Sequence, residues 1–249
     1  MSFTGQRVLV VGGTSGIGAG IAAAFAGQGA QVVATGATTA ECDAANKARA
    51  AEAAQARSPG GGVEHRLLDV RDGAAVQALV EGLGALNAVV CCAGVIRRGA
   101  ELDPAVFAEV VDINLNGAMR VAAAARPALR ASKGCIVNTA SMLSFFGGGL
   151  VPGYSASKGG VAQLTKSLAI AYAADGIRVN AVAPGWIATP LTQALQDDTG
   201  RSAQILGRTP LGRWGTPADV AGPVLFLCSP AAAFVTGVVL PVDGGYLIA

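Results

Sequence analysis

Short apolar runs alternate with longer stretches of helical periodicity along the chain, and several of the runs are nearly continuous in Val, Leu or Ile. The runs at residues 7–11, 31–34, 63–68, 88–92, 135–139, 178–182 and 238–242 predict seven β-strands. Strands that are apolar on both faces are typical of a parallel sheet covered by helices on each side. The pattern therefore predicts an α/β fold with right-handed crossovers between parallel strands.

Helical signals separate these strands. Ile17, Ile21 and Phe25 recur at helical spacing, and residues 40–57 predict an exposed helix. Asp103-Pro104 and Thr216-Pro217 each place an N-cap residue before a proline at the first helical position. Residues 58–62 break the pattern inside one helix–strand unit, so we interpret them as a surface loop and not as a domain linker. We expect one domain over residues 1–249.

Composition narrows the class of protein. Only 14% of the residues are charged, and 18 basic against 16 acidic residues leave a net charge of +2. This balance favours neither nucleic acid nor a membrane surface as a partner. We find no signal peptide and no apolar run of about 18 residues. Five cysteines without a C-x-x-C spacing indicate buried thiols in a reducing cytoplasm, and the single histidine, His65, argues against a metal site.

A glycine-rich turn follows the first strand. It reads Gly12-Gly13-Thr14-Ser15-Gly16-Ile17-Gly18 and runs into a helical pattern. Glycines let the backbone approach a pyrophosphate, and the helix N-terminus favours an anion. The alternative is a glycine-rich turn without a ligand. The next strand ends in Thr35-Gly36-Ala37-Thr38, which carries neither the acidic residue typical of NAD sites nor the arginine typical of NADP sites. An aspartate introduced at Gly36 is therefore expected to favour NAD.

Tyr154 and Lys158 lie four residues apart, so a helix places them on one face. A phenol with a pKa of about 10 needs to lose roughly three units to exchange protons near neutrality, and a nearby ammonium supplies an interaction of that size. The alternative is an ordinary surface pair. Ser141 follows the fifth strand, where its hydroxyl either bonds a substrate oxygen or caps a turn.

Taken together, the motifs resemble those of the short-chain dehydrogenase/reductase family over essentially the whole chain. The resemblance rests on the following residues: Gly12-x-x-x-Gly16-x-Gly18, Asp69, Asn114, Ser141, Tyr154-x-x-x-Lys158, Pro184-Gly185 with Thr189, and Asp243-Gly244-Gly245. It implies a Rossmann-type doubly wound sheet of seven parallel strands with helices on both faces. It also implies a dinucleotide-binding part at about 1–135 and a catalytic and substrate part at about 136–249.

The same resemblance assigns roles to residues. Tyr154 is then the proton donor and acceptor, and Lys158 lowers its pKa and holds the nicotinamide ribose. Ser141 orients the substrate, and Asn114 positions a water in a proton relay. The implied cofactor-binding residues are Gly12, Thr14, Ser15, Gly16, Ile17, Gly18, Gly36, Asp69, Val70, Cys92, Ala93, Gly94, Tyr154, Lys158, Pro184, Gly185, Ile187 and Thr189.

Two positions depart from the family pattern. Val11 stands where a threonine is usual, and Cys91-Cys92 replace an asparagine pair. A thiol is a poor substitute for an amide as a hydrogen-bonding partner. We therefore expect weaker support for the loops around the cofactor.

Three stretches resemble a narrower group, the sugar-acid dehydrogenases that act on 2-deoxy-D-gluconate or 2-dehydro-3-deoxy-D-gluconate. They are residues 93–98, residues 140–145 and residues 201–214. For the substrate we expect Arg97 or Arg98 as a cation for a carboxylate, with Met142 and Trp186 nearby. The alternative is that both arginines face solvent or a subunit contact. Residues 190–212 are polar and are interpreted as a substrate lid.

The resemblance further implies a homotetramer in the cytoplasm. Lack of a cation at Ser15 or Ala37 favours NAD over NADP. Two rival functions remain open. One is a 3-oxoacyl-thioester reductase or another carbonyl reductase, and the other is a non-catalytic nucleotide sensor.

Overall fold

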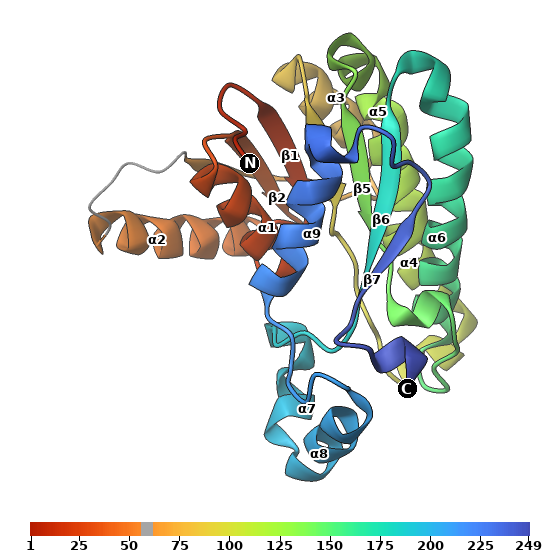
Figure 1. Ribbon diagram of the computed structural model, residues 1–249. Helices are drawn as coiled ribbons and strands as arrows, with labels where there is room; N and C mark the ends of the chain where they lie inside the picture. The colour runs from red at the N-terminus through yellow and green to blue at the C-terminus, as the bar shows by residue number, and fades with distance from the viewer. Residues whose placement is uncertain (56–61) are drawn as a thin grey trace.

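The computed structural model describes residues 1–55 and 62–249, so positions 58–61 of the expected surface loop lie outside the described residues. Its centre is one parallel sheet in the order β3-β2-β1-β4-β5-β6-β7 (Figure 1). The strands are β1 (Arg7–Val11), β2 (Gln31–Gly36), β3 (Val63–Leu67), β4 (Ala88–Cys91), β5 (Cys135–Thr139), β6 (Arg178–Pro184) and β7 (Val239–Val242). The predicted fold class is confirmed, with strand ends within two residues of those expected.

Alternation along β1 explains why both faces of the sheet are covered. Val8 and Val10 pack into one apolar cluster with α1 (Gly16–Gly27) and α9 (Pro217–Cys228). Leu9 and Val11 point the other way, into a cluster with α3 (Gly73–Leu83), α5 (Gly117–Ser132) and α6 (Pro152–Tyr172). The strand order reverses between β1 and β4, which is where open α/β sheets form ligand sites.

The remaining elements are helices and single helical turns. They are α2 (Thr39–Gln55), η1 (Ala100–Leu102), α4 (Pro104–Val111), η2 (Asp112–Asn116), η3 (Met142–Ser144), η4 (Ala173–Asp175), η5 (Pro190–Thr192), α7 (Gln193–Asp197), α8 (Thr199–Arg208), η6 (Pro230–Ala232) and η7 (Tyr246–Ile248). Helices α7 and α8 lie beyond the carboxyl ends of the strands (Figure 1). The chain reaches them after it leaves the carboxyl end of β6.

Both predicted N-caps form. Asp103 accepts hydrogen bonds from the first-turn amides Ala105 N and Val106 N of α4. Thr216 and Asp219 form a reciprocal capping box at the start of α9. The second cap anchors the helix that packs beside α1, and so supports the helix that follows the glycine turn.

The chain between α4 and α5 is not one regular helix. A single π-helical turn, η2, separates them and carries Asn114. Such turns insert an extra residue and are frequent at functional sites. Here the wider turn directs the Asn114 side chain to the segment after β4, where it bonds both Val95 N and Val95 O. Among the described residues, no helix combines the length and the apolar composition needed to cross a bilayer.

Candidate active site

A cavity of about 640 Å³ opens at the carboxyl edge of the sheet, within the range typical of ligand sites. It extends from the glycine turn to the first turns of α6. The predicted residues that line it are Gly12, Thr14, Ser15, Gly16, Ile17, Gly18, Gly36, Asp69, Val70, Cys92, Ala93, Gly94, Arg97, Tyr154, Lys158 and Thr189. The predicted residues that do not line this cavity are Asn114, Ser141, Pro184, Gly185, Ile187, Met142 and Trp186. The structure therefore brings together most, but not all, of the predicted site.

Two positions of the glycine turn, Gly12 and Gly18, have no room for a side chain. Gly12 adopts φ +78°, and a Cβ there would lie 2.5 Å from Ala93 N. A Cβ on Gly18 would lie 2.0 Å from the carbonyl oxygen of Gly12. The N-cap residue Ser15 makes no side-chain cap, which leaves amides of the first turn of α1 for another acceptor. This cradle suits the pyrophosphate of a dinucleotide.

A carboxylate that the sequence analysis did not consider lies at the end of β2. Glu41 accepts hydrogen bonds from Ala37 N at 2.7 Å and from Thr38 N at 3.3 Å, and it lines the cavity. The Thr38-x-x-Glu41 spacing is a capping-box signature and was the available signal. A Cβ on Gly36 would lie 3.1 Å from Glu41 Oε2. An aspartate at Gly36, expected above to favour NAD, would therefore place a second carboxylate beside the first and would press on Thr14 Cγ2, 2.7 Å from the added Cβ.

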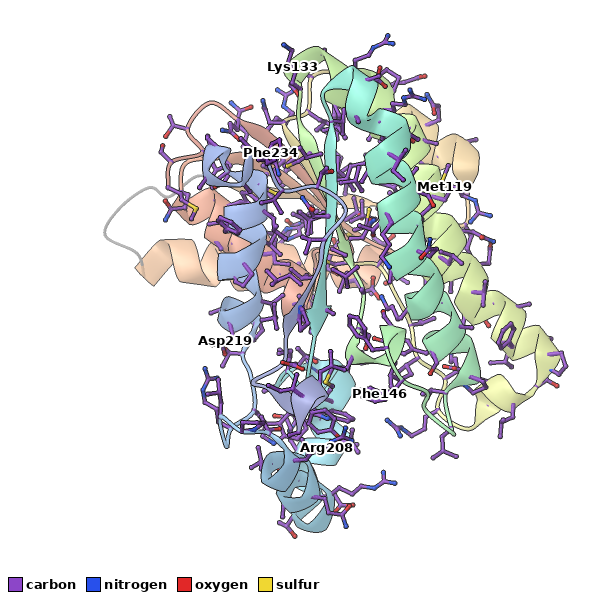
Figure 2. All side chains as sticks on the ribbon, turned by 45° about the vertical axis from the view of Figure 1, so that its right-hand side comes forward. Met119, Lys133, Phe146, Arg208, Asp219 and Phe234 are labelled. Atoms are coloured by element: carbon purple, nitrogen blue, oxygen red, sulfur yellow. The ribbon has the colours of Figure 1, made fainter. Side chains whose placement is uncertain are left out.

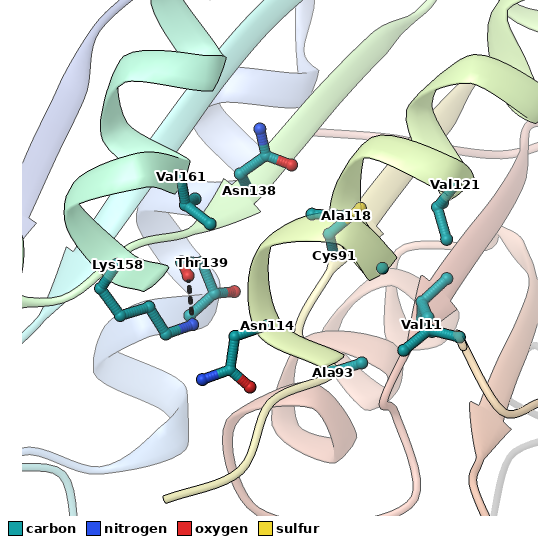
Figure 3. A pocket seen from close by; sticks show the side chains of 12 residues that line it. Val11, Cys91, Ala93, Asn114, Ala118, Val121, Asn138, Thr139, Lys158 and Val161 are labelled. Carbon is teal, nitrogen blue, oxygen red and sulfur yellow. Dashed lines mark hydrogen bonds between the residues drawn. The ribbon is translucent and has the colours of Figure 1, made fainter. Parts of the chain in front are cut away.

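Lys158 is a buried residue that lines the cavity. Its Nζ donates to the carbonyl oxygen of Thr139 at 2.7 Å, and only 4% of the residue is exposed (Figure 3). Burial lowers the pKa of Lys158 to about 8, because removing an ammonium from water costs more than its neighbours restore. Lys158 is thus much closer to neutrality than a surface lysine.

Tyr154 lies one helical turn from Lys158, with Lys158 Nζ 5.5 Å from the centre of its ring. The pKa of the Tyr154 phenol was expected to fall, but it is raised. Burial raises the pKa of Tyr154, the Ser141 side chain opposes the rise through a hydrogen bond, and the charge of Glu101 adds to it. The mutual spacing predicted from the sequence is correct, but desolvation outweighs the hydrogen bond with Ser141.

Ser141 and Asn114 lie behind Tyr154 and Lys158. Ser141 Oγ accepts from Leu143 N and so also caps η3, while Ser144 Oγ donates to the carbonyl oxygen of Lys158 at 2.7 Å. Asn114 Nδ2 donates to Val95 O and to Ser157 Oγ. Both side chains are therefore held in single orientations next to α6.

A void of about 10 Å³ lies between β5, α5 and α6, and Figure 3 shows the side chains around it. Asn114, Asn138 and Lys158 contribute polar atoms to its wall. Asn138 Oδ1 is buried and has no hydrogen-bond partner among the described residues. This volume is of the order that one water molecule needs, so the void is no substrate site.

Cys92 takes the place of the usual asparagine without opening the site. Its amide donates to Val11 O at 2.7 Å, and its sulfur accepts from Thr139 Oγ1 at 3.3 Å. Burial raises the pKa of the Cys92 thiol, which keeps it uncharged. The backbone path past Gly12 is thus kept, although the thiol replaces an amide.

The candidate substrate residues separate into two groups. Arg97 lines the cavity, with its guanidinium 3.8 Å from Glu109. Met142 is buried. Trp186 lines a second cavity of about 480 Å³ together with Ile187, and its Nε1 is buried without a hydrogen-bond partner among the described residues.

An aromatic cluster lies between the sheet edge and α8. The Trp186 ring packs against the rings of Trp214 and Tyr246 at 6.1 and 6.2 Å. The Arg208 guanidinium lies 4.3 Å from the centre of the Tyr246 ring and 5.6 Å from that of Phe146, and Figure 2 shows Phe146 and Arg208 close together. Arg208 therefore links α8 to the C-terminal segment through cation–π contacts.

Two comparisons with known proteins agree with this geometry. Residues 11–247 match the family model described as enoyl-(acyl carrier protein) reductase. The chain is 39% identical to 2-dehydro-3-deoxy-D-gluconate 5-dehydrogenase of Pseudoalteromonas atlantica, covering 99% of this chain and 97% of that protein. It is 36% identical to the L-tagatose-forming galactitol 2-dehydrogenase of Cereibacter sphaeroides, with coverages of 98% and 96%.

Solved structures give the same result. A gluconate 5-dehydrogenase from Burkholderia cenocepacia in complex with NADP and tartrate superposes with a TM-score of 0.90. It is 33% identical to this chain, and the match covers 100% of this chain and 97% of that one.

Proposed function

The chain belongs to the short-chain dehydrogenase/reductase family, and from this premise we propose that it interconverts a secondary alcohol and its ketone on a sugar acid or polyol with a nicotinamide cofactor. One observation carries the proposal. The glycine cradle and the Tyr154–Lys158 pair open into the same cavity. A dinucleotide bound along that cavity would place its reactive end beside a phenol.

In this proposal, residues 12–18 hold the pyrophosphate, while Asp69 and Val70 meet the adenine. Thr189 lies near the carboxamide, with Pro184, Gly185 and Ile187 supporting it from behind. A bound nicotinamide supplies the hydride chemistry. The protein contributes orientation, exclusion of water and control of the proton.

Tyr154 gives a proton to the ketone oxygen during reduction and removes it from the hydroxyl during oxidation. Its raised pKa keeps the phenol protonated, which suits the reductive direction in the protein alone. The Lys158 ammonium supports the phenolate that reduction leaves behind and bonds the nicotinamide ribose. Ser141 holds the substrate oxygen next to Tyr154, and Asn114 orders the path from Lys158 to water.

The substrate class follows from relatives and charge. Proteins named for 2-dehydro-3-deoxy-D-gluconate, galactitol and gluconate are among the relatives at 33–39% identity. Arg97 provides a guanidinium on the cavity wall for a carboxylate, and Met142 and Trp186 would close the far side of the substrate.

We propose NAD as the preferred cofactor. The NADP-bound relative shows that a nicotinamide dinucleotide occupies this fold. In this chain, however, Glu41 already accepts from the Ala37 and Thr38 amides that a 2′-phosphate would need. Its carboxylate would repel that phosphate and accept from a ribose hydroxyl.

The proposal also covers organisation. The two parts at about 1–135 and 136–249 would form one domain, and four copies would assemble in the cytoplasm. Exposed apolar side chains support assembly, with Ile170 81% and Phe234 fully exposed. The five cysteines are free thiols, as a reducing compartment favours. Sedimentation equilibrium at monomer mass would refute the tetramer.

The decisive experiment measures turnover of the purified protein. Sugar acids, polyols and 3-oxoacyl thioesters are tested with NAD(H) and with NADP(H), and cofactor absorbance is followed. We expect the highest kcat/KM on a sugar acid or polyol. A preference for acyl thioesters would establish the rival reductase, and no turnover with any substrate would favour the non-catalytic sensor.

A further inference from the structure

Two charged side chains are buried among those that the structure describes, and both flank Tyr154. One is Lys158, and the other is Glu101, which is 1% exposed. A buried carboxylate is costly unless hydrogen bonds compensate it. Glu101 accepts from Arg97 N at 2.6 Å through Oε1 and from Tyr154 N at 2.8 Å through Oε2. Each oxygen therefore binds a different segment of the site.

These two segments are far apart in the sequence. Arg97 follows β4, whereas Tyr154 lies in the first turn of α6, 53 residues after Glu101. The N-cap residue of α6, Val151, has no side chain able to cap it. Glu101 supplies that cap from another element, which also suits the positive end of the helix.

The fit around the carboxylate is close. A Cβ on Gly153 would lie 3.4 Å from Glu101 Oε2 and 3.3 Å from Phe107 Cα. Glycine at this position lets η1 and α4 approach the start of α6. The Tyr154 backbone is thereby set by a group outside its own helix.

Building on the function proposed above, we propose that Glu101 is a positioning residue. Its bridge from Arg97 N to Tyr154 N fixes the phenol of Tyr154 relative to Ser141 and to Arg97, the cation proposed to bind the substrate. A displacement of this bridge would move Tyr154 and Arg97 together. In this proposal Glu101 itself touches neither the substrate nor the cofactor.

The charge of Glu101 gives the proposal a distinctive readout. Coulombic interaction with Glu101 raises the pKa of Tyr154, in the same direction as burial. The other groups that face Tyr154 are Ser141 from η3 and Lys158 on its own helix. The charged residues Arg97 and Glu109 and the thiol of Cys92 line the same cavity. A substitution at Glu101 leaves the ionisable side chain of each of these groups in place.

Glu101→Gln keeps the shape of the side chain and removes its charge. The amide oxygen can accept from one amide N–H, but its NH₂ group then faces the other N–H donor. We expect kcat to fall about tenfold, as for loss of one charge-assisted hydrogen bond. We also expect cofactor Kd to stay within about twofold, because the glycine cradle is untouched. The acid limb of the oxidative rate profile should move to lower pH.

A second readout needs no turnover. Tyrosinate absorbance is titrated in the wild type and in Glu101→Gln, and the curve of Tyr154→Phe is subtracted to isolate Tyr154. The pKa of Tyr154 should be lower in Glu101→Gln. Asp103→Asn is the matched control, since Asp103 also accepts two backbone amides but only caps α4. Asparagine caps equally well, so kcat and the titration should not change.

The outcomes separate the possibilities. Unchanged kcat and an unchanged titration in Glu101→Gln would overturn the proposal, as would parallel losses of cofactor binding and turnover with no pH shift. If Glu101→Gln does not fold, Gly153→Ala decides. Its Cβ would lie 3.3 Å from Phe107 Cα and would press α4 away from the start of α6 while Glu101 keeps its charge. The kcat should therefore fall with the pH limb unmoved, and an unchanged kcat would refute positioning. A wild type that turns over no alcohol refutes the proposed function, whereas the titration still tests the link between Glu101 and Tyr154.

Discussion

Replacing Lys158 with methionine should alter how stability depends on pH. The Lys158 ammonium is buried, and its pKa of about 8 in the folded chain compares with 10.5 for an ordinary lysine. The unfolded chain therefore binds the proton more tightly than the folded chain. Below about pH 8 the lysine is charged in both states, and folding bears the full cost of burying the charge.

The size of the effect follows from the shift. A difference of about 2.5 units corresponds to about 3 kcal/mol of destabilisation at low pH, at 1.36 kcal/mol per unit. Because the unfolded state binds more protons between the two pKa values, stability rises with pH across that window. From about pH 7 to about pH 9.5, roughly 2 kcal/mol of the penalty disappears.

The assay is urea unfolding of the cofactor-free protein at several pH values, for the wild type and for Lys158→Met. Titrations of cysteines and tyrosines that do not interact with Lys158 are common to both proteins and cancel in the difference. The wild type should gain roughly 2 kcal/mol relative to the variant between about pH 7 and about pH 9.5. Parallel pH profiles would refute the claim that Lys158 is buried as a strained ammonium.

Three further changes probe the site. Gly18→Ala should abolish cofactor binding and lower the thermal midpoint of unfolding, because the added Cβ would lie 2.0 Å from Gly12 O. Gly27→Ala is the control: its Cβ would meet no atom within 4 Å, so the change should be neutral or stabilise α1 by up to about 1 kcal/mol. Equal effects of the two variants in calorimetry would contradict the cradle. Tyr154→Phe should reduce turnover at least a thousandfold, roughly the contribution of general acid–base catalysis, with cofactor affinity retained in fluorescence titrations; a variant that keeps most of its rate would remove Tyr154 from the mechanism. Glu41→Gln should improve NADP binding relative to NAD about tenfold, the order of one charged hydrogen bond, and an unchanged ratio of Kd values would show that Glu41 does not discriminate.

The sequence by itself was sufficient for every element whose signal is local. All seven strands were predicted, most of them because they are short apolar runs, and the caps at Asp103 and Thr216 were predicted because proline and capping residues act within one turn. The residues of the glycine turn and the Tyr154–Lys158 pair were singled out by their spacing, and the family resemblance gave them their expected roles. The structure places them on one cavity because parallel strands all end at the same edge of the sheet.

Tertiary structure decided the features that depend on residues distant in the chain. Nothing near Glu101 in the sequence indicates that its carboxylate bonds the backbone of Tyr154, 53 residues further along the chain. The pKa of Tyr154 was expected to fall, yet burial by surrounding elements raises it. Spacing along a helix determines which side chains are neighbours, whereas desolvation and long-range pairing depend on the packed environment, and these set the chemistry of the site.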